Sequence, residues 1–360
     1  MRSSSGVHYI ALDQVRALAV FMVIAWHFTH AWYGYPIPFE YVPALFPLAL
    51  LDEGHTGVAL FMTLSGYLFA KLLDGKTIDF RRFIWNRALR LLPLLGVVLL
   101  VLGIQLYVSG QNLLPYLYSI AEGVVLPTLP NGAWSIAVEF HYYLILPVLL
   151  WMLTKSNVLP ICIVIAAIVL RLSIHQITGE VQSLAYFTIV GHLDQFVLGM
   201  LVYQFRAHLA HRHAFAIAVF IAFAIFYWYF DLQGGFYKNP SYPSPSKLWI
   251  VIPTIEGLAY ATGIAWYESS FSHSTTGIAG FVGRIGEYSY SIYLLHFFFV
   301  FHAARFVNKQ IMDISNFYLA CLWSIVFLLT MVPIGYLSFR FIEAPFLKLR
   351  KPYIVALHSN

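Results

Sequence analysis

The sequence predicts an all-α, polytopic membrane protein, and its composition is the first observation behind that fold class. Of 360 residues, 60% are hydrophobic and only 10% are charged, whereas soluble domains carry about 25% charged residues. The aromatic share of 18% is typical of proteins with interfacial aromatic belts. The net charge of +5 does not indicate a nucleic-acid partner, because the basic residues gather beside apolar segments.

The second observation is the number of long apolar segments. A membrane-spanning helix needs about 20 mostly apolar residues, and we expect ten such helices in one integral-membrane domain that covers residues 1–360. The longest polar interruption, at 231–247, is rich in glycine, proline and serine, so we expect a loop there. The expected spans cover residues 10–30, 55–72, 92–109, 132–153, 158–174, 184–205, 214–232, 248–267, 285–307 and 316–342.

The third observation is the distribution of basic residues between the connections. If both termini share one side of the membrane, that side holds 15 lysines and arginines and the opposite side holds 5. Cytoplasmic loops are enriched in these residues, so we expect both termini in the cytoplasm. Asp13 and Arg16 interrupt the first apolar segment, which is therefore not expected to be a cleaved signal peptide.

The first expected span, "LDQVRALAVFMVIAWHF" at 12–28, carries three ionisable residues, Asp13, Arg16 and His27. On a helix, the eleven residues from Arg16 to His27 make about three turns, so both side chains lie on one stripe, roughly 16 Å apart. Asp13 and Arg16 can pair at i and i+3. One interpretation is a snorkelling ion pair with a satisfied core histidine, and the other is a polar pathway that faces the interior of the bundle.

The segment "FRRFIWNRALRLLPLL" at 80–95 contains four arginines and no lysine. Arg87 and Arg90 point the same way on a helix, with Arg81 and Arg82 a turn or two earlier. A cytoplasmic basic anchor explains the cluster, and so does a phosphate site, since guanidinium groups bind phosphate bidentately. The absence of lysine favours phosphate.

Two later spans carry polar residues at membrane depth. Glu139 lies inside "NGAWSIAVEFHYYLILP" at 131–147, where a carboxylate is costly unless it is paired. In "GEYSYSIYLLHFFFV" at 286–300, Tyr293 and His296 belong to a polar stripe, which can equally well be interhelical hydrogen bonding. Asp194, Glu256 and Glu343 are isolated groups of the same kind.

Six motifs in order give the chain a resemblance to the acyltransferase-3 family of membrane O-acyltransferases, over about residues 9 to 346. They are Arg16 with His27; "GVALFMTLSGYLFA" with Ser65 and Gly66; Arg87 and Arg90 with Pro93; "WSIAVEFHYYLILP" with Trp134, Ser135, Glu139 and Tyr143; "YSYSIYLLH"; and "FIEAP".

The resemblance implies a cytoplasmic acyl-CoA donor, most often acetyl-CoA, and a carbohydrate hydroxyl as acceptor, at a bacterial inner membrane. We expect His27 to act as general base, with a transient acyl-histidine as the alternative, and Glu139 to orient His27 or Arg16, which pairs with Asp13. The phosphates are assigned to Arg87, Arg90, Arg82 and Ser65, and the acceptor to Trp134, Tyr143, Tyr293, His296 and Asp194.

The expected partners are a polysaccharide or lipid-linked sugar and membrane lipid, with no nucleic acid. No metal is expected, because the two cysteines lie in apolar runs and no CxxC motif is present. Some relatives carry an extracytoplasmic esterase-like domain, for which we expect no counterpart in the printed sequence. Two other functions fit the polar spans: a secondary transporter of a sugar or acyl group, and a sensor or binding module.

Overall fold

The computed structural model describes residues 9–31 and 35–356, and these residues are mostly helical. The long helices are α1 (Ile10–Thr29), α3 (Gly57–Leu73), α4 (Phe80–Val108), α6 (Trp134–Lys155), α7 (Val158–Thr178), α9 (Ile189–Gln204), α11 (His213–Leu232), α12 (Ile252–Ser270) and α16 (Phe317–Ser338).

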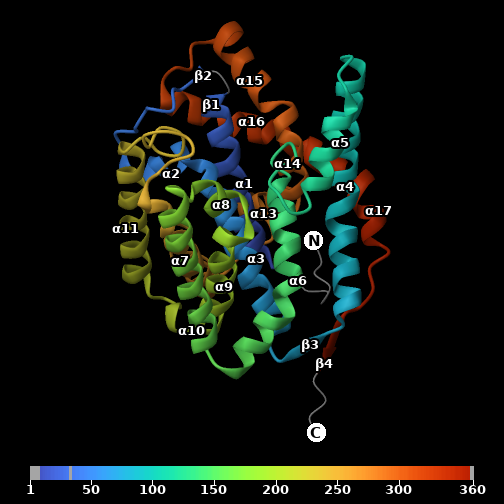
Figure 1. Cartoon of the computed structure of the whole chain (residues 1–360), viewed down its shortest axis with the longest axis vertical. Helices are drawn as coiled ribbons and strands as arrows, with labels where there is room; N and C mark the ends of the chain where they lie inside the picture. The colour runs from blue at the N-terminus through green and yellow to red at the C-terminus, as the bar shows by residue number, and fades with distance from the viewer. Residues whose placement is uncertain (1–8, 32–34, 357–360) are drawn as a thin grey trace.

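Shorter helices connect or extend the long ones, and Figure 1 shows α15 at one end of the bundle, α10 at the other, and α8, α13 and α14 between them. They are η1 (Phe46–Leu48), α2 (Ala49–Asp52), η2 (Gly54–Thr56), α5 (Leu113–Glu122), α8 (Gln182–Phe187), α10 (Arg206–Leu209), η3 (Lys247–Ile250), α13 (Gly277–Glu287), α14 (Ser289–Leu295), η4 (His296–Phe298), α15 (Val300–Phe306), η5 (Val307–Ile311), η6 (Phe339–Glu343) and α17 (Ala344–Leu347).

The helices confirm an all-α membrane protein. Among the described residues, seven are long and apolar enough to cross a membrane, and one bent pair makes an eighth candidate. All eight coincide with expected spans. The pair covers the expected span 285–307, but it is bent by 60° between Phe298 and Val300. A continuous apolar run therefore contains a break that hydropathy did not indicate.

The two remaining expected spans, 184–205 and 248–267, are helical but do not meet that criterion. In the first, Thr188 separates α8 from α9, which has 16 residues. In the second, α12 carries Glu256 and Glu268 among its 19 residues. Both helices lie in the interior, where polar side chains find protein partners, so less apolar surface is needed to face lipid.

The arginine-rich segment begins α4 earlier than expected, at Phe80 rather than residue 92. The Asp79 side chain caps this helix by accepting a hydrogen bond from Arg82 N. With 29 residues, α4 is about 43 Å long at 1.5 Å per residue, which exceeds the roughly 30 Å hydrocarbon core of a bilayer. Its first turns can therefore lie at the membrane boundary.

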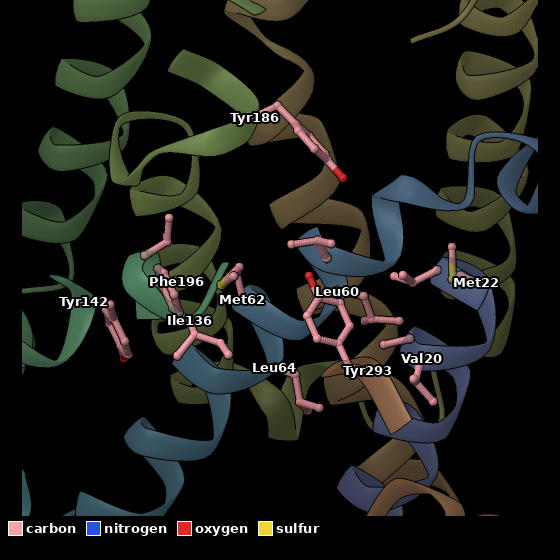
Figure 2. Packing of buried hydrophobic residues seen from close by; sticks show 14 of the residues in the cluster. Val20, Met22, Leu60, Met62, Leu64, Ile136, Tyr142, Tyr186, Phe196 and Tyr293 are labelled. Carbon is pink, nitrogen blue, oxygen red and sulfur yellow. The ribbon is translucent and has the colours of Figure 1, made fainter. Parts of the chain in front are cut away.

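The helices α3 and α9 pack backbone against backbone at two glycines. A Cβ on Gly66 would come within 2.0 Å of Phe196 O, and a Cβ on Gly199 within 2.1 Å of Thr63 O. Small residues allow this close approach between membrane helices. Figure 2 shows Leu60 and Leu64 of α3 packing around Tyr293 of α14 in the same core.

Two short strand pairs lie at opposite ends of the molecule (Figure 1). At one end, β1 (His30–Ala31) pairs with β2 (Tyr35–Pro36). At the other end, β3 (Lys76–Ile78) pairs antiparallel with β4 (Ile354–Ala356). The second pair joins the start of α4 to the C-terminal segment of the described chain.

Candidate active site

The helix α1 connects two cavities, because its first turns line one and its last turn lines the other. We call them the basic cavity and the aromatic cavity. Asp13 and Arg16 line the basic cavity, and Val23, Trp26 and His27 line the aromatic cavity. The predicted stripe on α1 therefore runs from the lining of one cavity to the lining of the other.

The basic cavity has a volume of about 180 Å³ and lies between α1, α3, α4, α6 and α14. Arginine dominates its polar surface, which explains its name. The charged residues of its lining are Asp13, Arg16, Arg87, Arg90, Glu139, Glu287 and Arg350.

Within the described part of the chain, two of the four arginines have a carboxylate partner. Arg16 donates to Asp13, as the i, i+3 spacing predicted, and Arg90 donates to Glu343 of η6. Arg87 packs over the ring of Phe69, 5.1 Å from its centroid. Among the described residues, Arg87 Nε is buried with no hydrogen-bond partner, although a buried charged donor normally has one. The cavity thus presents a guanidinium with unused donor capacity, which fits a phosphate group.

The carboxylate of Glu139 faces the basic cavity rather than His27. It accepts hydrogen bonds from Tyr143 on its own helix and from Ser65 Oγ of α3 at 3.4 Å. The expected pairing of Glu139 with His27 or Arg16 is absent from its hydrogen bonds in the described part of the chain. Its contacts instead place the carboxylate beside Arg87, with Tyr143 between them.

The aromatic cavity has a volume of about 160 Å³ and carries three histidines, His27, His30 and His55. Aromatic faces and nearby polar atoms are typical of surfaces that bind sugar rings, which have both apolar and hydroxyl-bearing faces. The aromatic lining consists of Trp26, Phe39, Trp134, Tyr186, Phe187, Phe236, Tyr237, Tyr293 and Phe297.

The hydrogen bonds of His27 assign its base nitrogen. Its Nδ1 lies 2.8 Å from Val23 O, and because a carbonyl only accepts, Nδ1 carries the proton. His296 Nδ1 donates to Tyr293 O in the same way, so His296 Nε2, 3.3 Å from His27 Nδ1, is an acceptor. The neutral His27 ring therefore has its lone pair on Nε2, which makes no hydrogen bond to the described residues.

The two cavities share two residues, Val58 and Tyr293. The Tyr293 hydroxyl donates to Gly132 O at 3.0 Å and accepts from Ser135 Oγ at 3.0 Å. Gly132 has φ +71, and a Cβ there would meet the Tyr293 hydroxyl at 3.1 Å. The glycine therefore lets the turn before α6 approach this junction closely.

Several predicted site residues come together around these chambers. Ser65, Arg87, Arg90 and Glu139 line the basic cavity with Asp13 and Arg16, while Trp134 and His27 line the aromatic cavity. Tyr143, which was assigned to the acceptor, lines the basic cavity instead. His296 is fully buried behind His27, with ring centroids 5.0 Å apart.

Two predicted residues lie elsewhere. Asp194 lines neither chamber and instead pairs with Arg171 at 2.7 Å, with both side chains fully buried. Arg82 is not among the lining residues of the basic cavity and pairs with Asp79 at 3.1 Å. The prediction that Asp194 binds the acceptor and that Arg82 binds the donor is therefore not supported by their positions. The free-energy cost of burying a carboxylate was interpreted as a sign of a binding site. For Asp194, an ion pair between helices offsets this cost.

Sequence reasoning missed Arg350, His30, His55 and Tyr186. Each lies in a connection or beside a helix end rather than in a matched motif, and only tertiary packing brings it to a chamber. Of these, His55 had a signal, since it follows Asp52 and Glu53 in a short polar interruption. His55 Nε2 lies 2.9 Å from Glu53 Oε2.

No group of three or more histidine, cysteine, aspartate or glutamate side chains that could hold a metal ion occurs in the described ranges.

The sequence matches the family described as "Acyltransferase domain", Acyl_transf_3, over residues 9–340. The chain belongs to the acyltransferase-3 family. The resemblance carried by the six motifs is thereby confirmed. No solved structure matches the chain.

The curated relatives are bacterial proteins. O-acetyltransferase OatA of Staphylococcus aureus (strain NCTC 8325 / PS 47) is 25% identical over 382 residues, covering 94% of this chain and 57% of the relative. A protein of S. aureus strain COL, provisionally named an O-acetyltransferase, is 26% identical over 96% of this chain and 58% of its own length. Peptidoglycan O-acetyltransferase OatA of Listeria monocytogenes is 26% identical over 40% of this chain and 24% of the relative. The chain thus spans somewhat more than half the length of its staphylococcal relatives.

Proposed function

We propose that this protein is an O-acetyltransferase of the bacterial inner membrane. It transfers the acetyl group of acetyl-CoA, bound in the basic cavity, to a hydroxyl of a surface polysaccharide or lipid-linked sugar in the aromatic cavity. The observation that carries the proposal is the meeting of the two chambers at Val58 and Tyr293, with Arg16 and His27 of one helix on opposite sides.

The basic cavity suits the donor because its lining contains four arginines and only three carboxylates. Arg87 has unused donor capacity, and Arg90 lies one helical turn away on the same face. Phosphates bound there leave the pantetheine arm free to extend along α1. The roughly 16 Å from Arg16 to His27 is then the distance over which the thioester is brought to the second chamber.

His27 is the proposed general base. Its Nε2 lone pair takes the proton of the acceptor hydroxyl, and the hydroxyl oxygen forms a bond to the thioester carbonyl carbon. The carbon–sulfur bond breaks, and the imidazolium returns its proton to the CoA sulfur, which leaves as the thiol. His296 holds the His27 ring through Nδ1 and acts as a positioning residue.

The acceptor side is supported by the aromatic lining and by the relatives' names. One relative is named a peptidoglycan O-acetyltransferase, and Trp134 and Tyr186 offer flat faces at 5.1 Å between ring centroids. We propose a glycan acceptor of this class.

The orientation is also proposed. The lining of the basic cavity includes Arg350, which follows α17 and precedes β4. The strands β3 and β4 lie at one end of the molecule, and the loop 231–247 lies toward the other (Figure 1). With 15 basic residues on the side of the termini, we propose that ten helices cross the membrane and that both termini are cytoplasmic. The donor chamber then opens toward the compartment that contains acetyl-CoA.

The proposal is tested with purified protein in proteoliposomes, acetyl-CoA and a soluble peptidoglycan fragment, by following CoA thiol release and ester formation together. His27→Ala should lower turnover by about 10²–10⁴-fold, the usual contribution of a positioned acid–base group, and should leave acetyl-CoA binding unchanged. Near wild-type turnover in that variant would refute the base. Accumulation of the sugar inside the vesicles without thiol release would favour a transporter, and binding of the sugar without either would favour a sensor.

A further inference from the structure

The segment that follows α17 is fastened to the start of α4. Asn86 Nδ2 donates to Lys351 O at 2.6 Å, and Lys351 N donates to Asn86 Oδ1 at 3.0 Å. Asp79 N donates to Tyr353 O at 2.8 Å. Asn86 of α4 and Asp79, the N-cap of α4, thus hold the backbone that follows Arg350.

Side-chain packing strengthens this attachment. Tyr353 is 1% exposed and meets Phe83 edge to face, with ring centroids 5.4 Å apart. Asn86 is fully buried, so its amide can satisfy the segment's backbone groups without competition from water. The β3–β4 pairing continues the contact as far as Ala356.

This attachment brings Arg350 into the basic cavity, beside Arg87 and Arg90. Arg350 Nε is buried with no hydrogen-bond partner among the described residues, as is Arg87 Nε. Burial, together with the charges of Arg87 and Arg90, lowers the pKa of the Arg350 guanidinium to about 9. Glu343 pairs with Arg90, and Glu139 lies beside Arg87. Arg350 adds a further guanidinium for which no ion pair with a described residue is found, and like charges at short range repel unless another anion lies among them.

We propose that Arg350 is a third phosphate-binding residue of the donor site, delivered to Arg87 and Arg90 by the segment that Asn86 and Asp79 hold. The inference rests on the proposed function, since it assigns the ligand as the phosphates of acetyl-CoA. A phosphate oxygen can accept from the Nε–H that each of Arg87 and Arg350 leaves unused, and the planar guanidinium fork favours such bidentate binding.

The same phosphate chemistry could come from an anionic lipid headgroup, and the site decides between the two sources. Arg350 shares its cavity with Glu139, Ser65 and Tyr290, which belong to helices on several sides. A headgroup that stays anchored in the bilayer would have to reach between these helices, whereas a soluble nucleotide is not tied to the lipid. We therefore commit to the nucleotide.

The test compares Arg350→Ala, Arg350→Lys and Lys351→Ala in the full chain, purified in detergent, by titration calorimetry with acetyl-CoA. Lys351 is the matched control because it loses the same charge from the same segment while its side chain is exposed. Arg350→Ala should weaken acetyl-CoA binding by about 10-fold to 100-fold, the loss of a charge-assisted contact. Arg350→Lys should lie between Arg350→Ala and wild type, and Lys351→Ala should bind within about 2-fold of wild type.

Turnover separates binding from folding. At saturating acetyl-CoA, Arg350→Ala should keep its kcat while its KM for acetyl-CoA rises. Asn86→Leu, which releases the segment, should weaken acetyl-CoA binding similarly, and adding Arg350→Ala to it should cause little further loss. Two results would overturn the inference. In the first, Arg350→Ala binds acetyl-CoA as tightly as wild type does. In the second, Arg350→Ala and Lys351→Ala weaken binding equally.

The remaining outcomes are also decisive. In one, phosphatidylglycerol vesicles stabilise wild type against heat but not Arg350→Ala, while both proteins bind acetyl-CoA equally tightly. That result would assign Arg350 to lipid and overturn the inference. Wild-type protein that binds no acetyl-CoA would refute the proposed donor itself. If wild type binds acetyl-CoA and Arg350→Ala binds it equally well, the inference is refuted but the proposed donor is not.

Discussion

His296 Nε2 lies 3.3 Å from His27 Nδ1, and the two histidines come from helices 269 residues apart in the sequence. Because each Nδ1 also faces a carbonyl oxygen, the proton positions on both rings are determined by their backbone partners. The pair therefore holds one nitrogen of His27 as a fixed donor and leaves the other as a base. Carbonyl groups on α1 and α14, rather than a carboxylate, set this tautomer.

Replacing His296 should slow the chemical step without weakening donor binding. In His296→Ala, His27 keeps its bond to Val23 O but loses its second contact, so its ring orientation is less restricted. We expect kcat to fall by about 10-fold to 100-fold, part of the 10²–10⁴-fold contribution of an acid–base group. The KM for acetyl-CoA should stay the same.

A pH–rate profile distinguishes positioning from structural damage in that variant. The base acts unprotonated, so the rate should rise with pH through the pKa of the histidine, whose unperturbed value is about 6.5. His296→Ala should retain this ascending limb at a shifted midpoint, since His27 remains. An unchanged midpoint with reduced folded protein would mean that His296 only supports the core.

Trp134 tests the acceptor chamber. Trp134→Ala removes an aromatic face of the aromatic cavity but no atom of the basic cavity. We expect the KM for the glycan to rise by about 10-fold, the loss of one stacking contact, while acetyl-CoA affinity is unchanged. Trp151→Ala is the control, because Trp151 is an exposed tryptophan on the same helix. Equal effects from both tryptophans would remove the glycan from this chamber.

Hydropathy and motif spacing predicted the parts of the molecule that are local in sequence. The stripe of Asp13, Arg16 and His27 follows from helix geometry alone, and the Arg16–Asp13 pair forms as predicted. The break at Phe299 could not be predicted in this way, because the run 285–307 is apolar on both sides of the bend. A bend depends on what the helix packs against rather than on its hydropathy.

The site was predictable only where a side chain belongs to a motif on a long helix. Arg350 was missed because its place depends on Asn86, 265 residues away in sequence from its bonded neighbour Lys351. The assignment of Asp194 to the acceptor lacks support from its position for a related reason. A single carboxylate in an apolar run indicates that a partner exists, but the sequence does not show whether the partner is a substrate or Arg171.

The topology is tested with reporter fusions. A reporter after residue 356 and one inserted in the loop 231–247 should report opposite sides of the membrane, because these segments lie at opposite ends of the molecule (Figure 1). The reporter after residue 356 should be cytoplasmic by the distribution of basic residues. The same side for both would contradict the proposed ten spans, and an extracytoplasmic C-terminal reporter would contradict the donor's entry side.

The ion pair of Arg171 and Asp194 gives the last prediction, which concerns stability rather than turnover. Arg171 donates to Asp194 at 2.7 Å, to Ile250 O at 2.8 Å and to Thr254 Oγ1 at 2.9 Å, so one guanidinium joins α7, α9 and the start of α12. Asp194→Leu leaves this fully buried cation without its anion, and such a change costs about 3–5 kcal/mol.

We therefore expect Asp194→Leu to lower the melting temperature of the detergent-solubilised protein strongly, and Arg171→Met with Asp194→Leu to recover most of the loss, since both charges are then removed. Glu40→Gln is the control, because it breaks the exposed pair with Lys238 and should change the melting temperature little. Whatever folded Asp194→Leu protein remains should transfer acetyl groups at the wild-type rate per molecule. A stable Asp194→Leu protein with a raised KM for the glycan would return Asp194 to the acceptor site, where the sequence alone had placed it.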